Sequence, residues 1–121
     1  MSEIAVERIS ITTTGSAGSA TGSGTVIPIN GYLLDVYLDY HASCPATADV
    51  TIADPVFGNI LVRSNSATDG WFAPRKQTCT SAAADTGSYD LIPLNGALTI
   101  SVAQADALTG CVVVYVRWLT P

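Results

Sequence analysis

The feature that most constrains the fold is an alternation of apolar and polar residues with a period of two. It is clearest in residues 32–41, YLLDVYLDYH, and in residues 111–119, CVVVYVRWL. Successive side chains of a β-strand point to opposite faces of its sheet, so this period predicts strands that bury one face. In the first segment the residues expected to face the core are Tyr32, Leu34, Val36, Leu38 and Tyr40. In the second they are Val112, Val114, Val116 and Trp118, which places Cys111 on the opposite face.

Shorter segments with strand character occupy much of the remaining chain, and helix signals are nearly absent. They are residues 4–13, 49–53, 59–63, 89–94 and 98–103. Turn-forming pairs separate several of them, and Asn95-Gly96 is a strong β-hairpin signal. The pattern predicts an all-β fold, a single antiparallel β-sandwich or jelly-roll-like domain of about seven to nine short strands.

The sequence leaves only the N-terminal part of this domain undecided. Residues 1–13 are either the first strand of the sandwich or an arm that contacts another subunit, and residues 14–121 form the sandwich domain. The block 12–26, TTTGSAGSATGSGTV, has the composition of a linker. Its position between strand-like segments instead favours a weakly specified edge strand or a long surface turn.

The composition combines an apolar chain with few charges. Hydrophobic residues make up 48% of the 121 residues and charged residues only 12%, against a usual charged share of about 25%. So low a share of charged residues is typical of a protein whose surface is partly covered by other proteins. The net charge of −5, with five Lys and Arg residues in all, disfavours nucleic-acid binding. No apolar run approaches the length of a membrane span, and the N-terminus does not resemble a signal peptide, so we expect folding in a cytoplasm.

Residues with catalytic or metal-binding chemistry are sparse. The only histidine, His41, lies beyond Asp39 on the outward face of a predicted strand, and no G-x-S-x-G motif is present. His41, Cys44, Cys79 and Cys111 are the residue types of a zinc site, but they lack the paired spacing of one. We therefore expect no catalytic site, no metal and no cofactor, and three reduced thiols, with a disulfide between two of them left open.

The segment 68–76, TDGWFAPRK, gathers aromatic and cationic residues that are otherwise rare in this chain. Asp69-Gly70 reads as a tight turn, and the adjacent Trp71 and Phe72 would point to opposite faces of a strand. One aromatic then fills the core and the other faces outward beside Arg75 and Lys76. The residues predicted to contact another protein are Trp71, Phe72, Arg75, Lys76, Tyr37, His41, Ile4 and Val6.

Three segments in this order resemble small structural proteins of tailed bacteriophages, which are often head decoration (cement) proteins. They are PINGYLLDVYLDYHASCPATADVTI, SNSATDGWFAPR and LTISVAQA, and the resemblance covers about residues 28–116. It implies a non-enzymatic virion component that is made in the host cytoplasm and binds the outer surface of the phage head. The implied partners are the major capsid protein and further copies of the chain, with a trimer favoured.

An alternative function from another class is a tail or fibre module that binds a host receptor or glycan. In that case Trp71 would be the stacking platform and Asp69 a hydrogen-bond acceptor. An enzyme with His41 as its base is the third and least supported hypothesis.

Overall fold

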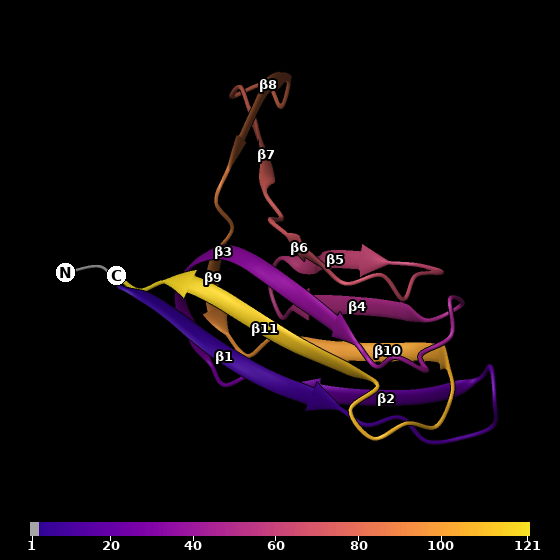
Figure 1. The fold of residues 1–121 in the computed structure, drawn as a ribbon. Coiled ribbons are helices and arrows are strands. Elements are labelled where there is room, and N and C mark those ends of the chain that lie inside the picture. The colour runs from indigo at the N-terminus through magenta and orange to yellow at the C-terminus, as the bar shows by residue number, and fades with distance from the viewer. Residues whose placement is uncertain (1–2) are drawn as a thin grey trace.

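The computed structural model describes residues 3–121 and shows eleven strands (Figure 1). They are β1 (Ile4–Ile11), β2 (Ala20–Thr25), β3 (Ile29–Tyr40), β4 (Asp49–Asp54), β5 (Gly58–Arg63), β6 (Gly70–Phe72), β7 (Lys76–Cys79), β8 (Asp85–Asp90), β9 (Pro93–Gly96), β10 (Thr99–Ala105) and β11 (Val112–Leu119). The predicted number of strands was too low, because short segments without clear alternation also pair. Within residues 3–121 no helix is long and apolar enough to cross a membrane.

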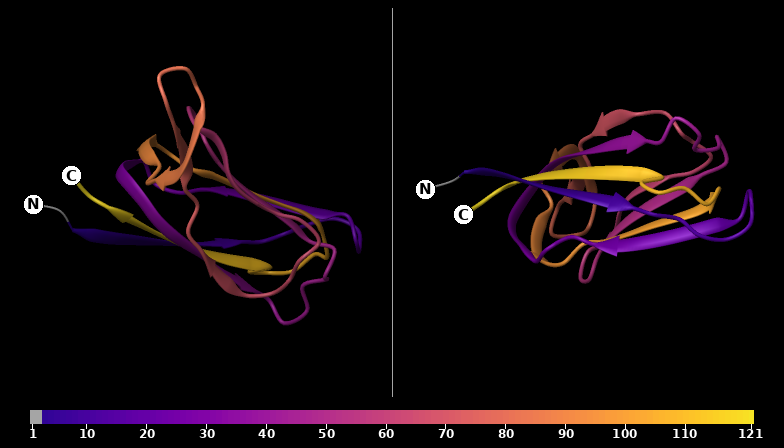
Figure 2. Two further views of the ribbon diagram at one scale, coloured as in Figure 1. Left: turned by 90° about the horizontal axis from the view of Figure 1, so that it is seen from above. Right: turned by 60° about the horizontal axis from the view of Figure 1, so that its bottom comes forward.

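Two antiparallel sheets face each other and form a β-sandwich, as predicted (Figures 1 and 2). The first sheet has the order β1-β11-β3-β6, and β9 pairs with the first part of β3. The second sheet has the order β2-β10-β4-β5. Strands β7 and β8 pair only with each other.

The core lies between the two sheets and is formed by the inward face of each. All four inward residues predicted for β11 are buried, which confirms the alternation in that strand: Val112, Val114, Val116 and Trp118. They pack with β3 residues such as Leu38 and, from the second sheet, with Ile52 and Ile100. Burial of this apolar surface is the main stabilising contribution to such a fold.

A β-bulge in β3 overturns the prediction for the start of that strand. Asp35 lies opposite Arg117 and Leu33 opposite Trp118, so Leu34 has no partner in the register with β11. The extra residue reverses the alternation. Leu33 is therefore fully buried, whereas Tyr32, which was expected in the core, is 47% exposed and Leu34 is only half-buried.

The Asn95-Gly96 pair does not form the predicted hairpin. It ends β9, which belongs to the first sheet, whereas β10 belongs to the second. Gly96 has a φ of 151°, a conformation that favours glycine, and the chain passes there from one sheet to the other. A turn signal identifies a change of direction but not the sheet that the chain enters next.

The N-terminal segment is an edge strand over residues 4–11. β1 pairs with β11 along its whole length, so of the two alternatives for residues 1–13 the strand is observed there. Residues 1 and 2 lie outside the described part. The Gly- and Ser-rich block contributes β2, an edge strand, which is one of the two alternatives predicted for it. A Cβ on Gly22 would lie 2.4 Å from the carbonyl oxygen of Thr12, so glycine permits this close approach of the two edge segments.

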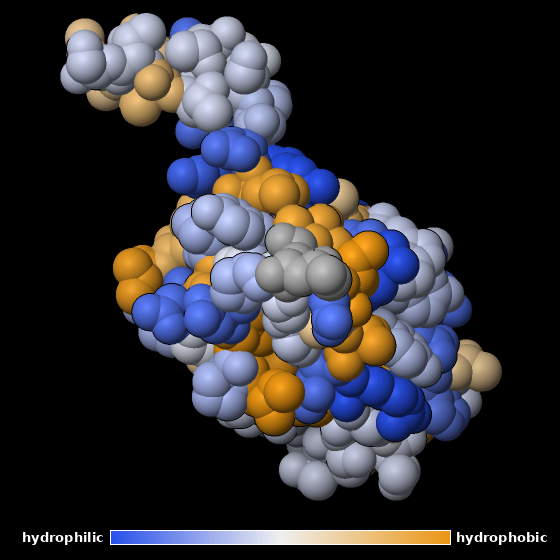
Figure 3. Space-filling model, turned by 90° about the vertical axis from the view of Figure 1, so that its left-hand side faces the viewer, coloured by the Kyte–Doolittle hydropathy of each residue, from blue (hydrophilic) through white to orange (hydrophobic). Residues whose placement is uncertain are grey.

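Residues 77–87 are mostly small and polar, and they form most of a projecting hairpin. We call residues 76–90, which comprise β7, β8 and their turn, the arm. It stands away from the sandwich in Figure 1, and the space-filling view in Figure 3 shows it extending beyond the body. Its small polar residues carry little apolar alternation, so its pairing was not visible in the sequence.

Candidate functional site

Strand β6 fixes the orientation of the two adjacent aromatics. Its Trp71 lies opposite Tyr37 of β3, and its Phe72 lies opposite Val36. Phe72 is half-buried against the core, with the guanidinium of Arg63 4.7 Å from its ring centroid. Trp71 points outward and is 54% exposed. The prediction that one aromatic faces the core and the other faces outward is confirmed, and Trp71 is the outward one.

Asp69 holds the turn that leads into β6. Its Oδ1 accepts a hydrogen bond of 2.7 Å from the backbone N–H of Tyr40, at the end of β3. A carboxylate bound to a backbone N–H in this way orders the chain around it. Asp69 was predicted to accept a hydrogen bond from a ligand, and this contact already occupies one of its two oxygens.

Four outward side chains lie in register across the first sheet, and we call them the aromatic row: Arg8, Tyr115, Tyr37 and Trp71. Each is the direct cross-strand partner of the next, from β1 through β11 and β3 to β6. The ring centroids of Tyr37 and Trp71 are 4.9 Å apart and those of Tyr37 and Tyr115 are 6.2 Å apart. Both separations are within the range of favourable aromatic contacts. The Arg8 guanidinium carbon lies 5.9 Å from the Tyr115 ring centroid.

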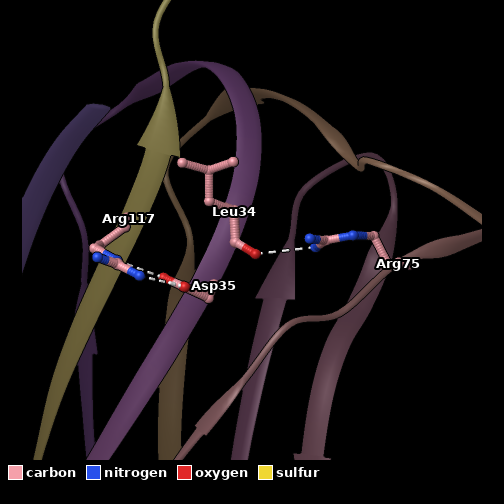
Figure 4. Close-up of polar contacts among 4 residues, drawn as sticks. All are labelled: Leu34, Asp35, Arg75 and Arg117. Carbon is pink, nitrogen blue, oxygen red and sulfur yellow. Dashed lines mark hydrogen bonds and ion pairs between the residues drawn. The ribbon is translucent and has the colours of Figure 1, made fainter. Parts of the chain in front are cut away.

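Arg117 supports one end of this row. It donates two hydrogen bonds, of 2.7 Å and 2.6 Å, to the two carboxylate oxygens of Asp35 on β3 (Figure 4). Its guanidinium carbon lies 4.5 Å from the Trp71 ring centroid, a cation–π contact. The hydrogen bond to Asp35 raises the pKa of Arg117, so the guanidinium stays charged. Bidentate pairing of this kind restricts the guanidinium plane.

Arg75 connects the bulge in β3 to the base of the arm. One of its guanidinium nitrogens donates a hydrogen bond of 2.9 Å to the carbonyl oxygen of Leu34 (Figure 4). The same nitrogen donates a second hydrogen bond of 2.9 Å to the carbonyl oxygen of Pro74. Leu34 is the bulged residue, whose carbonyl oxygen therefore has a side-chain partner. Lys76 follows directly as the first residue of the arm.

The arm makes its principal contacts within itself. Every residue of β8 is exposed, and Tyr89 is 65% exposed although it is a large aromatic. A two-stranded hairpin is marginally stable in water unless it packs on another element. The arm is therefore a candidate for contact with another subunit.

The other predicted contact residues are Ile4, Val6 and His41, and Val6 is the cross-strand partner of Arg117 on the outer face of the first sheet. Ile4 and Val6 are well exposed on the outer face of the edge strand β1. His41 is exposed after β3, where its Nδ1 accepts a hydrogen bond of 3.0 Å from the backbone N–H of Ser43. The sequence did not identify Arg8, Tyr115 or Arg117, although the outward positions of β11 already indicated the last two.

The three cysteines are free and divide into a buried pair and an exposed residue. The Sγ atoms of Cys44 and Cys111 lie 3.5 Å apart, and Cys79 is exposed on the arm. The prediction that Cys111 faces away from the core was wrong, because it precedes β11 and is buried between the sheets. No group of three or more His, Cys, Asp or Glu side chains among residues 3–121 is placed to hold a metal ion.

A pocket of about 580 Å³ lies where the β4–β5 turn approaches β3 and β9. Its lining residues are Asn30, Gly31, Tyr32, Asp54, Val56, Phe57, Pro93, Leu94, Asn95 and Pro121. Asp54 is only 6% exposed, and its Oδ2 accepts hydrogen bonds from the backbone N–H groups of Val56 and Phe57. This carboxylate therefore orders the turn. Figure 3 shows apolar side chains at the end of the body where the C-terminus lies.

Comparison with known proteins gives a distant structural likeness. No family model matches the chain, and no curated protein matches it in sequence. A structure of the carbohydrate-binding module TmCBM61, solved in complex with β-1,4-galactotriose, matches with a TM-score of 0.36 and 7% sequence identity. The match covers 98% of this chain and 86% of that one. A likeness this distant carries no property of that module over to this chain.

Proposed function

We propose that this protein is a non-enzymatic structural component of a tailed-phage virion that binds the outer surface of the head as a decoration protein. In this role it stabilises the capsid by contacting the major capsid protein and further copies of itself, as a trimer. The observation that carries the proposal is the arm, which leaves the sandwich and exposes every residue of β8.

The arm supports an assembly role on energetic grounds. Its hairpin has no core of its own, and ordering about 15 residues costs on the order of 1 kcal/mol each or more in backbone entropy. Contact with a neighbouring subunit would offset part of that cost. A shell presents such neighbours at every binding position.

The free edge of the first sheet supports the same role. Ile4 and Val6 expose apolar surface on β1, whose outer edge has no strand partner within residues 3–121. Exposed edges of this kind pair readily with another chain. The low charge of the chain also fits a surface that neighbours cover.

The test is a variant in which the arm is shortened without disturbing its base. Gln77 and Tyr89 are cross-strand partners, so residues 78–88 can be replaced by an Asn-Gly turn. The matched control is Val62→Ser, which removes an exposed apolar side chain from the second sheet.

The readouts are co-sedimentation with undecorated capsids and the oligomeric state from light scattering. We expect the shortened variant to lose capsid binding, trimer formation or both, while Val62→Ser retains them. If wild-type protein stays in the supernatant at every salt concentration, the decoration function is wrong. If the wild type binds and the shortened variant binds and assembles equally well, the arm has no part in assembly.

A further inference from the structure

We infer that the aromatic row is a binding site for a neutral, hydroxyl-rich glycan, a function separate from capsid attachment. The inference depends on the aromatic row, whereas the proposed decoration function depends mainly on the arm and on the exposed edge strand β1. The two can therefore succeed or fail independently.

The row has the shape that stacking on sugar rings requires. Tyr115, Tyr37 and Trp71 lie on three neighbouring strands, which places their side chains over about 10 Å of the sheet at the usual strand spacing. A hexose presents one face of C–H groups, which packs on an aromatic ring, and a rim of hydroxyl groups. A line of rings of this length suits a short run of consecutive sugars better than a single small molecule.

The rings are held in place before any ligand arrives. Trp71 contacts Tyr37 on β3, and Arg117 approaches the indole ring while its Nε and Nη2 donate hydrogen bonds to Asp35. Side chains that are already ordered lose little conformational entropy on binding. Because 54% of the Trp71 surface remains accessible, the indole is also open to a ligand.

The charges near the row favour a neutral ligand with hydrogen-bond donors. Two guanidiniums, those of Arg8 and Arg117, already contact aromatic rings of the row. Asp39 and Asp69 lie close enough to Tyr37 that, after burial, they contribute to raising the pKa of its hydroxyl group. These two carboxylates place negative charge beside the centre of the row, which disfavours anionic ligands such as phosphates or acidic sugars. Asp35 is already paired with Arg117, and one oxygen of Asp69 binds the backbone of Tyr40, so the acceptors for the hydroxyl groups of a neutral sugar are Asp39 and the second oxygen of Asp69.

The chain offers a direct optical readout. It has two tryptophans, and Trp118 is buried whereas Trp71 is exposed. Acrylamide therefore quenches mainly Trp71 in the folded protein, and a glycan stacked on the row would protect it.

The experiment titrates the full chain with cellopentaose, maltopentaose and galactopentaose as neutral probes and with sialyllactose as an anionic probe. Binding is followed by protection from acrylamide quenching and, for the variants, by calorimetry. We expect at least one neutral pentasaccharide to bind and sialyllactose not to bind. Trp71→Ala should weaken binding at least tenfold, and Tyr37→Ala should weaken it as well. Trp71→Phe should retain part of the affinity.

The matched control is Tyr89→Ala, which removes an exposed aromatic from the arm and should leave glycan affinity unchanged. Circular dichroism confirms that each variant is folded. Any one of three results overturns the inference: no neutral probe binds, Trp71→Ala binds like wild type, or Tyr89→Ala weakens binding as much as Trp71→Ala. Loss of capsid co-sedimentation in Trp71→Ala would also overturn it, because the row would then be a capsid contact.

Discussion

Cys44 and Cys111 should resist alkylation in the folded protein by several orders of magnitude relative to the exposed Cys79. Burial, followed by the hydrogen bond from Cys111, raises the pKa of the Cys44 thiol from 9.0 to about 12. At pH 8 such a thiol is ionised in roughly one molecule in 10⁴, whereas an ordinary thiol with a pKa of about 8.5 is ionised in about a quarter. The thiolate is the reacting species, so ionisation alone slows Cys44 about 10³-fold.

Access adds to this protection, because Cys111 has an exposed fraction of 0% and lies between the sheets. Alkylation of either buried thiol should therefore require opening of the fold. The assay treats folded protein with iodoacetamide at pH 8 and quantifies each cysteine peptide by mass spectrometry over time. Urea-unfolded protein is the control in which all three cysteines react alike. If Cys44 or Cys111 reacts within about tenfold of Cys79 in the folded protein, the buried pair is wrongly placed.

Three further predictions concern stability. Because the folded-state pKa of Cys44 lies above its unfolded value, its contribution to stability is complete below about pH 8.5 and is lost as the pH rises towards 12. Calorimetric Tm should therefore fall above pH 9, and Cys44→Ala should reduce that slope. Gly31→Ala would place a Cβ 2.1 Å from a backbone carbonyl oxygen of β11, so urea unfolding should show a loss of more than about 2 kcal/mol. Gly87→Ala, also at positive φ but with nothing within 4 Å, should lose only about 1 kcal/mol. Arg75→Ala should cost no more than about 1 kcal/mol, since water can replace its exposed hydrogen bonds; a larger loss would mean that the arm base is buried.

The sequence predicts a strand best where alternation runs unbroken to its end. β11 alternates without interruption, and its inward residues were predicted correctly. In β3 the adjacent Leu33 and Leu34 are the only local sign that the alternation changes phase. A bulge depends on the register with a partner strand, which the segment itself does not encode.

The aromatic row shows a second limit of sequence reasoning. Tyr37 and one of the pair Trp71 and Phe72 were expected to face outward, but nothing local shows that Trp71 and Tyr37 meet. Their contact follows from pairing between residues 70–72 and 36–38. Arg8 and Tyr115 come from strands near opposite ends of the chain, so only the assembled sheet brings them into line. Long-range pairing of this kind is the part of a β-fold that local patterns specify least.

The segment 68–76 links the two surfaces to which we assign functions. Asp69 fixes the entry to β6, Trp71 completes the aromatic row, Phe72 anchors the strand on the core, and Arg75 holds the chain to the bulge just before the arm begins. A change to the backbone of this segment would therefore disturb the row and the arm together. If such a variant lost both glycan binding and capsid binding, the result would not show which surface carries which function. Only changes that leave this connection intact can separate them, namely truncation of the Trp71 side chain for the row and shortening beyond Gln77 for the arm.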